Sequence, residues 1–232
     1  MRWRGTSIDT ADRPVKSGSL QERLLEIKAG IAQYVRPDNQ AINERVIAEL
    51  RERAVQRNVL LVGSEAPDFE LPDQGGKPIS SCDLRAQGKL LIHFYRGRWC
   101  PFCMTTLEAW REALPDIQAL GAAFCAISPQ LVRHSAFTAD QHRLRFPVLS
   151  DAGNAVARAF GLVYEVPDHQ RELFRRVFVS LENLNGMRYE EWSLPIPATF
   201  VIGQDGKILF ADANPDYMQR TEPSEIVSLL RA

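Results

Sequence analysis

The chain has 232 residues, of which 45% are hydrophobic and 25% charged, and this composition supports one well-buried domain with room for an extension. Its net charge is -1 and it has no strong basic block, which argues against a nucleic acid or an anionic membrane as partner. No stretch approaches the roughly 18 apolar residues of a membrane span, and the first residues lack the apolar centre of a secretory signal. We therefore expect a cytoplasmic protein.

The N-terminal residues divide into two predicted parts. Residues 1–17 are polar and without periodicity, which predicts a mobile tail. In residues 18–57, apolar side chains recur at spacings of three and four on either side of a break at residues 36–38, which predicts a helical hairpin. These apolar positions are Leu20, Leu24, Ile27, Ile31, Ile42, Val46, Ile47, Leu50 and Ala54. The hairpin is expected to cover the main domain or to form a homodimer, and the sequence does not choose between them.

Residues 58–232 are predicted to form one α/β domain. Short extended pieces come first, and buried strand runs then alternate with helical stretches, which predicts a mixed central sheet flanked by helices. The expected strands are 90–95, 122–128, 146–150, 198–202 and 207–210, and the expected helices include 129–144, 154–160 and 223–230. Asp205-Gly206 is a strong hairpin signal between the last two strands. Residues 163–192 show no readable pattern.

The candidate functional residues lie in the stretch Lys89–Leu114. An apolar strand run ends at residues 96–98, and Cys100 then precedes Pro101, which favours the first position of a helix because it lacks an N–H. The pattern therefore predicts Cys100 at the cap of a helix and Cys103 in its first turn. Further along, Pro115 is expected to end or kink this helix.

A cysteine at a helix start has a chemical meaning, because the thiolate is the reactive form and a helix N-terminus stabilises negative charge. We expect both Cys100 and Cys103 to be unusually acidic. Arg96 and Arg98 would strengthen the effect if their guanidinium groups turn toward the sulfurs. A Cys-x-x-Cys pair in this position can close into a disulfide and reopen, which is the reaction of a dithiol redox site.

The other two cysteines offer little support for a metal site. Four cysteines are too few for a disulfide scaffold, and zinc or iron-sulfur ligation would need further ligands at suitable spacing. Cys125 lies within a predicted strand and is expected to be a small core residue. Cys82 is ambiguous, and a longer-range disulfide is its less favoured interpretation. The sequence predicts no cofactor and no metal.

Several polar and aromatic residues near the pair also need an interpretation. Trp99 is expected either to pack in the core or to form the lip of a substrate groove. His93, within the central strand, is more simply a buried and hydrogen-bonded histidine than a catalytic base. His134, His142 and His169 are expected at the surface.

The chain resembles the peroxiredoxin-like branch of the alkyl hydroperoxide reductase and thiol-specific antioxidant family in the motifs GSEAPDFELPD, FYRGRWCPFC, AISPQ, FPVLSD and LPIPATFVIGQDGKI, with a following DYMQR-TEP segment. The resemblance implies a thioredoxin-like fold, in which Pro197 would be the cis proline that faces the redox cysteines. Tyr217 and Arg220 belong to the last of these motifs, and we expect them to have a structural role.

The chain also departs from this family. Typical peroxiredoxins carry Pro-x-x-x-Thr-x-x-Cys, and these positions fall on Arg96, Cys100 and Cys103, so that two of the three differ. The arginine that helps to polarise the peroxide in typical members falls on Pro197. Arg96 or Arg98 is expected to replace the missing cation.

We expect a thiol-dependent peroxidase, in which one thiolate becomes a sulfenic acid, the other cysteine condenses with it, and a dithiol such as thioredoxin resets the pair. The family motif puts Cys103 in the attacking position, whereas the cap geometry favours a more exposed Cys100 as nucleophile with Cys103 resolving. One alternative is a thiol-disulfide oxidoreductase with little peroxidase activity. Another is a redox sensor that turns over no substrate.

Overall fold

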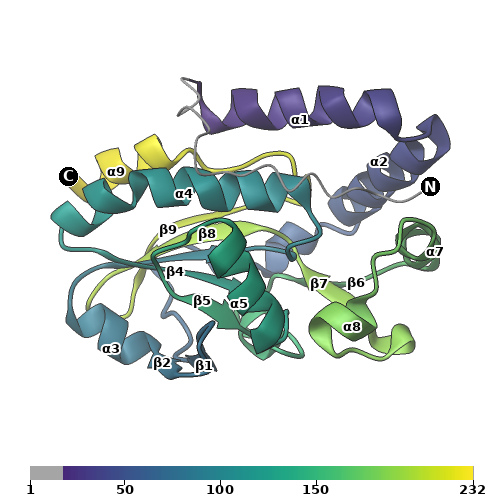
Figure 1. The fold of residues 1–232 in the computed structure, drawn as a ribbon. Helices are drawn as coiled ribbons and strands as arrows, with labels where there is room; N and C mark the ends of the chain where they lie inside the picture. Colours follow the sequence, from purple (N-terminus) through teal and green to yellow (C-terminus); the bar gives the residue numbers. More distant parts are fainter. Residues whose placement is uncertain (1–17, 232) are drawn as a thin grey trace.

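The structure is a computed structural model that describes residues 18–231. The tail predicted for residues 1–17 lies outside the described residues. A five-stranded mixed sheet in the order β5-β4-β3-β8-β9 forms the centre of the molecule (Figure 1). Its strands are β3 (Leu90–Phe94), β4 (Ala123–Ser128), β5 (Val148–Ser150), β8 (Ala198–Ile202) and β9 (Ile208–Ala213). β3, β4 and β5 are parallel, whereas β8 is antiparallel to both β3 and β9, so the predicted mixed sheet is confirmed.

Two further pairs of short strands lie outside this sheet. They are β1 (Glu70–Pro72) with β2 (Pro78–Ser80), and β6 (Val163–Glu165) with β7 (Ser193–Pro195). The predicted hairpin is present between β8 and β9, where Gly206 has a φ of +86° and the Gly203 N–H donates to the Lys207 carbonyl over 2.8 Å. A positive φ of this size favours glycine, which explains the Asp-Gly signal.

Helices cover both faces of the sheet. They are α1 (Leu20–Tyr34), α2 (Pro37–Glu52), α3 (Ser81–Ala86), α4 (Pro101–Ala119), α5 (Val132–Gln141), α6 (Ala155–Ala159), α7 (Asp168–Arg176), α8 (Leu181–Asn185) and α9 (Pro223–Arg231), with short 3-10 turns at Val55–Asn58 and Tyr189–Glu191. Figure 1 shows α4 and α9 over one face, with α1 above them, and α1 and α9 both contact α4. Among residues 18–231, no helix is both long enough and apolar enough to cross a membrane.

The core consists of two clusters, one on each face of the sheet, because successive side chains of a strand point to opposite sides. Leu91 and Tyr95 pack with α4, α1 and α9, whereas Leu90, Ile92 and Phe94 pack into the second cluster with residues of α2, α6 and α7. Every side chain of β3 is buried, as expected for a central strand covered on both faces.

Helix α4 continues through Pro115 to Ala119. Of the end or kink expected near Leu114, the end is therefore wrong. A proline in a helix loses one backbone hydrogen bond. Leu114 and Ile117 are both buried on either side of the proline, and this packing keeps the helix intact to Ala119.

The start of α1 is fixed by two sets of hydrogen bonds. Ser19 and Glu22 form a capping box, in which each side chain accepts from the other residue's backbone N–H. The carboxylate of Glu222 accepts from the N–H groups of Leu20 and Gln21 at 2.9 and 2.8 Å. A carboxylate is favourable at this position because unpaired N–H groups and the helix dipole attract negative charge.

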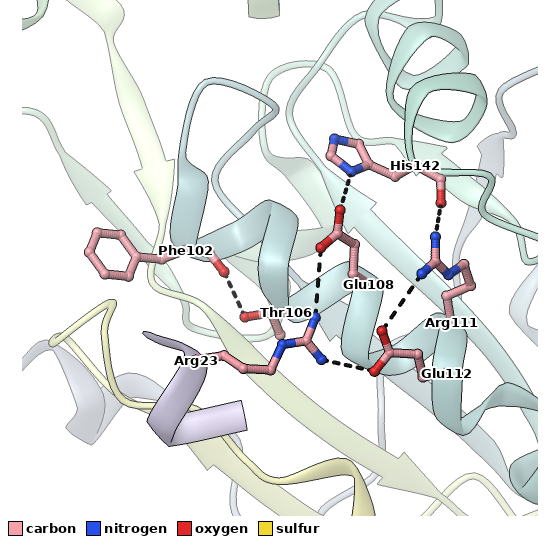
Figure 2. A network of polar contacts seen from close by, with 7 residues as sticks. All are labelled: Arg23, Phe102, Thr106, Glu108, Arg111, Glu112 and His142. Atoms are coloured by element: carbon pink, nitrogen blue, oxygen red, sulfur yellow. Dashed lines mark hydrogen bonds and ion pairs between the residues drawn. The ribbon is translucent and has the colours of Figure 1, made fainter. Parts of the chain in front are cut away.

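Figure 2 shows a polar network that ties α1 to α4. Arg23 of α1 pairs with Glu112 at 2.8 Å and with Glu108 at 3.7 Å, both on α4. His142, which follows α5, contacts Glu108 over 3.0 Å through Nδ1. Arg111 donates to the His142 carbonyl over 2.9 Å, so the network joins three helices.

Helices α1 and α2 pack against different elements, α1 against α4 and α2 against α7. Helix α7 lies within residues 163–192, for which the sequence showed no pattern, and α8 follows it there. The division into a hairpin at 18–57 and a domain at 58–232 stays a prediction.

Candidate active site

A tight turn joins β3 to α4. Gly97 has a φ of +148°, and a Cβ at this position would lie 2.7 Å from Trp99 Nε1, so the turn requires glycine. The Arg98 N–H donates to Gln130 Oε1 over 2.6 Å, and the Cys100 N–H donates to the Gly97 carbonyl over 3.1 Å. These bonds fix the direction in which the chain enters the helix.

Cys100 and Cys103 lie at the start of α4, as the sequence predicts. Cys100 is the N-cap residue and Pro101 is the first helical residue. Both sulfurs belong to free thiols, and the exposed fractions of Cys100 and Cys103 are 1% and 0%. The expectation of a more exposed Cys100 is therefore wrong, because neighbouring side chains cover both residues.

The guanidinium group of Arg96 contacts Cys100 directly. Arg96 Nη2 donates a hydrogen bond to Cys100 Sγ over 3.1 Å, and the arginine is only 4% exposed. Its central carbon lies 3.8 Å from the ring centroid of Tyr217 and 4.9 Å from that of Trp99. Aromatic rings attract a planar cation and hold its orientation, so Arg96 is a fixed positive charge beside the sulfur.

A second cation comes from the far end of the chain. Arg220 Nη2 lies 3.9 Å from Cys103 Sγ. Tyr217 and Arg220 were expected to have a structural role, whereas Arg220 contacts Cys103 and Tyr217 contacts Arg96. The signal that pointed to them was the DYMQR-TEP motif, and it carried no information on which elements it would contact.

The surroundings make the two thiols unequal. Burial opposes ionisation of Cys100, but a hydrogen bond with Cys103 and the charges of Arg96 and Arg220 hold its pKa well below the usual range of a thiol. Burial, the same hydrogen bond and the negative charge on Cys100 raise the pKa of Cys103 well above that range. The expectation that both cysteines are acidic is therefore wrong for Cys103, because two adjacent sulfurs do not both ionise readily.

Two further expectations need correction. The Arg98 guanidinium lies over the ring of Phe137 at 4.0 Å, so of the two arginines in the turn it is Arg96 that contacts a sulfur. The described residues contain no cis peptide bond, so the expected cis bond before Pro197 is wrong. The trans form is the ordinary state of a peptide bond, including most bonds before proline.

Other residues singled out in the sequence have packing roles. His93 is buried and its Nδ1 lies 3.1 Å from Thr199 Oγ1, its register partner on β8. Trp99 is half-buried, and its ring meets that of Phe174 edge to face at 4.9 Å. Cys125 is buried in β4, where burial raises the pKa of its thiol.

The contacts of Cys82, His134 and His142 are with residues other than Cys100 and Cys103. Cys82 is an exposed free thiol whose sulfur is 3.5 Å from Arg85 Nη2. His134 contacts the Asn183 carbonyl over 3.0 Å, and His142 belongs to the network of Figure 2.

Comparisons with known proteins show the family and the fold of the chain. A sequence model of the AhpC/TSA family matches residues 62–211. Peroxiredoxin Bcp of Escherichia coli is 30% identical over 105 residues, which are 45% of this chain and 67% of that protein. Peroxidoxin BcpB from Mycobacterium tuberculosis has a TM-score of 0.56 and 27% identity, over 73% of this chain and 96% of the other.

A solved structure of the bacterioferritin comigratory protein of Xanthomonas campestris, a protein with alkyl peroxide reduction activity, has a TM-score of 0.52. It is 19% identical, covers 70% of this chain and 90% of the other, and shows the fold alone. The thioredoxin-like fold inferred from the motifs is thus confirmed, and the comparisons support the expected class of enzyme, a thiol-dependent peroxidase. Because the family model spans more than half of its residues, the chain belongs to the AhpC/TSA family.

Proposed function

We propose that this protein reduces hydroperoxides with Cys100 as the attacking thiolate and Cys103 as the resolving thiol. The Cys100 thiolate attacks one peroxide oxygen, the O–O bond breaks, and the leaving alkoxide or hydroxide takes a proton. Cys100 is then a sulfenic acid. The Cys103 thiol displaces its hydroxyl as water, and a disulfide forms between the two sulfurs. An external dithiol reduces this disulfide and is itself oxidised.

The observation that carries this assignment is the hydrogen bond of 3.1 Å from Arg96 to Cys100. A guanidinium at this distance stabilises a thiolate in a buried site, where charge interactions are strong. Cys100 is also the N-cap of a helix of 19 residues, whose free N–H groups favour the same charge. The guanidinium contact of Cys103 is longer, with Arg220 Nη2 at 3.9 Å from its sulfur.

Arg96 and Arg220 together supply the positive charge that the family places at the position of Pro197. During attack, negative charge moves from the sulfur to the leaving oxygen, and fixed cations lower the free energy of that state. The Nε atoms of both arginines are buried without a hydrogen-bond partner in the described structure, so each has a donor to offer a peroxide oxygen.

The partners follow from the chemistry. The substrate is a hydroperoxide, and the reductant is a dithiol protein of the thioredoxin type. A cytoplasmic location and a homodimer through the N-terminal helices belong to the same proposal, as does the absence of nucleic-acid and membrane partners. The location and the absence of these partners rest on the composition of the chain. The homodimer rests on helices α1 and α2, which lie before the residues that match the family.

The assignment of the two sulfurs is tested by intact-mass spectrometry of Cys100→Ser and Cys103→Ser after mild peroxide treatment. Cys103→Ser is expected to gain one oxygen atom as a sulfenic acid, and Cys100→Ser is expected to gain none. Sulfenic acid in Cys100→Ser alone would show that Cys103 attacks. Peroxide consumption by the wild-type protein with thioredoxin as reductant tests the enzyme class.

The runner-up function is a thiol-disulfide oxidoreductase, favoured by the Cys-x-x-Cys pair that starts α4. The burial of both sulfurs does not separate the two functions, because a disulfide substrate and a dithiol protein that resets the peroxidase must both reach the same atoms. A disulfide-reduction assay on insulin, run beside the peroxide assay, separates the two functions. A redox sensor would show the disulfide but turnover in neither assay.

A further inference from the structure

A second cavity lies where α7, α8 and the turn at Tyr189–Glu191 meet, in the part of the chain for which the sequence showed no pattern. Figure 1 shows these two helices beside the β6–β7 pair. The cavity has a volume of about 500 Å³, within the range of about 300–1,000 Å³ that is typical of small-molecule pockets. Its lining includes Arg175, Phe178, Val179, Glu182, Tyr189 and Trp192, but neither cysteine of the pair.

A stack of aromatic rings supports one wall of this cavity. Trp192 is 1% exposed, and its ring meets that of Tyr189 edge to face at 5.0 Å. On the other side, Phe174 lies 6.5 Å from Trp192 and 4.9 Å from Trp99. Rings packed in this way have little freedom to move, so the wall is formed before a ligand arrives. A preformed wall lowers the free-energy cost of binding.

The buried tryptophan in this wall has an unused hydrogen-bond donor. Trp192 Nε1 is buried and has no hydrogen-bond partner in the described structure. An indole N–H donates only, and a buried one normally finds an acceptor because leaving it unpaired is unfavourable. An oxygen atom of a ligand in the cavity would supply the acceptor.

Arg175 adds a positive charge to the same cavity. Its guanidinium carbon lies 5.7 Å from the ring centroid of Tyr189, and no carboxylate of residues 18–231 forms an ion pair with it. Glu182 also lines the cavity without an ion pair among these residues, and its charge opposes an anion. Arg175 and Trp192 nevertheless offer two donors to an anionic oxygen, and a charged donor gives the stronger hydrogen bond.

Phe178 brings an exposed aromatic ring to this cavity. The residue is 93% exposed and has a φ of +60°, in the left-handed region that favours glycine. A phenylalanine held in this region is strained, and strained residues often lie where a protein contacts a ligand. Its ring is available to cover an apolar group in the cavity.

We propose that this cavity binds a small organic carboxylate with an aromatic body. The carboxylate accepts hydrogen bonds from Arg175 and from Trp192 Nε1, and the aromatic body packs against Tyr189, Val179 and Phe178. The binding is noncovalent, and it does not rest on the proposed peroxidase function.

The test is isothermal titration calorimetry of the reduced full-length protein with 2-naphthoate and with its neutral analogue 2-naphthamide. The wild type should bind one molecule of 2-naphthoate, about tenfold or more tightly than the amide. Arg175→Gln should weaken binding of 2-naphthoate by about tenfold or more and leave that of the amide unchanged. Glu182→Gln should tighten binding of 2-naphthoate about twofold or more, because a repelling charge is removed.

Arg176→Gln is the matched control, because Arg176 is the next residue of α7, pairs with Glu172 and does not line the cavity. Its affinity for 2-naphthoate should equal that of the wild type. Trp192→Phe keeps a ring and removes the N–H, and should weaken binding about threefold or more. If this variant fails to fold, the exposed Arg175→Gln and Arg176→Gln still decide. No binding of 2-naphthoate, equal affinities for the acid and the amide, or equal losses in the two arginine variants would overturn the site.

Discussion

The guanidinium group of Arg96 forms a cation–π contact with the ring of Tyr217, with its central carbon 3.8 Å from the ring centroid. The tyrosine thereby sets the plane of a group that donates to Cys100 Sγ. Tyr217, in the segment between β9 and α9, thus orients the charged group of Arg96, which follows β3.

This contact gives the first prediction. Tyr217→Leu removes the ring, so Arg96 loses its orientation, and we expect the rate of sulfenic acid formation at neutral pH to fall about tenfold, in line with a desolvated cation–π contact. The pH at which the rate is half-maximal should rise, because the pKa of Cys100 is held down partly by Arg96. Tyr217→Phe keeps the ring and is the control. Equal losses in the two variants would assign the effect to the hydroxyl group.

The second prediction concerns Arg220, which contacts Cys103. Its charge favours the thiolate of Cys103, so Arg220→Gln should slow disulfide formation and lengthen the life of the sulfenic acid on Cys100, by about tenfold or more for the loss of one charged donor. Trapping with dimedone at timed intervals measures that life. The neighbouring exposed residue offers a control, Gln219→Ala, which should resolve at the wild-type rate.

The third prediction concerns the network of Figure 2. Arg23 is 11% exposed in its side chain and pairs with two carboxylates, so Arg23→Ala should lower the free energy of unfolding by about 2 kcal/mol. Arg176→Ala breaks an exposed pair with Glu172 and should cost about 0.5 kcal/mol or less. Urea denaturation of both variants makes the comparison. Similar losses would mean that the network does not anchor α1.

The fourth prediction concerns pH and His93. Burial, with the nearby charge of Arg220, lowers the pKa of His93 to about 3, against roughly 6.5 in the unfolded chain. Between these values the unfolded state binds a proton that the folded state does not, so stability falls as the pH falls from about 6.5 toward 3. At pH 5 the loss relative to pH 7 should be about 2 kcal/mol.

Denaturation curves of the Cys100→Ser protein isolate this effect, because Cys100 also has a lowered pKa and contributes its own dependence on pH. Adding His93→Gln should remove most of the loss between pH 7 and 5. An undiminished slope in the double variant would assign the titration to another group.

The local features of the site could be predicted from the sequence. The strand run, the turn at residues 96–98 and Pro101 together place Cys100 at the N-cap, because each depends on neighbours within a few positions. The β8–β9 hairpin was predictable for the same reason. The thioredoxin-like fold followed from the family resemblance, and the order of the strands in its sheet was not predicted.

The long-range features could not be predicted. Arg220 and Cys103 are 117 positions apart, and their contact depends on how the segment after β9 folds back over α4. The unequal acidity of the two thiols depends on their mutual hydrogen bond and on which guanidinium lies nearer to each. Of the end or kink expected at Pro115, the end is absent, because buried packing on both sides of the proline, at Leu114 and Ile117, outweighs a local signal.

The hydrogen bonds of Glu222 with the start of α1 have a practical consequence for anyone cloning this protein. A truncation to the matched residues 62–211 would look like a natural minimal unit. It would delete Tyr217, Arg220 and Glu222 from one end and both N-terminal helices from the other. The two removed pieces contact each other, and the boundary of the residues that match the family therefore cuts through the proposed active site.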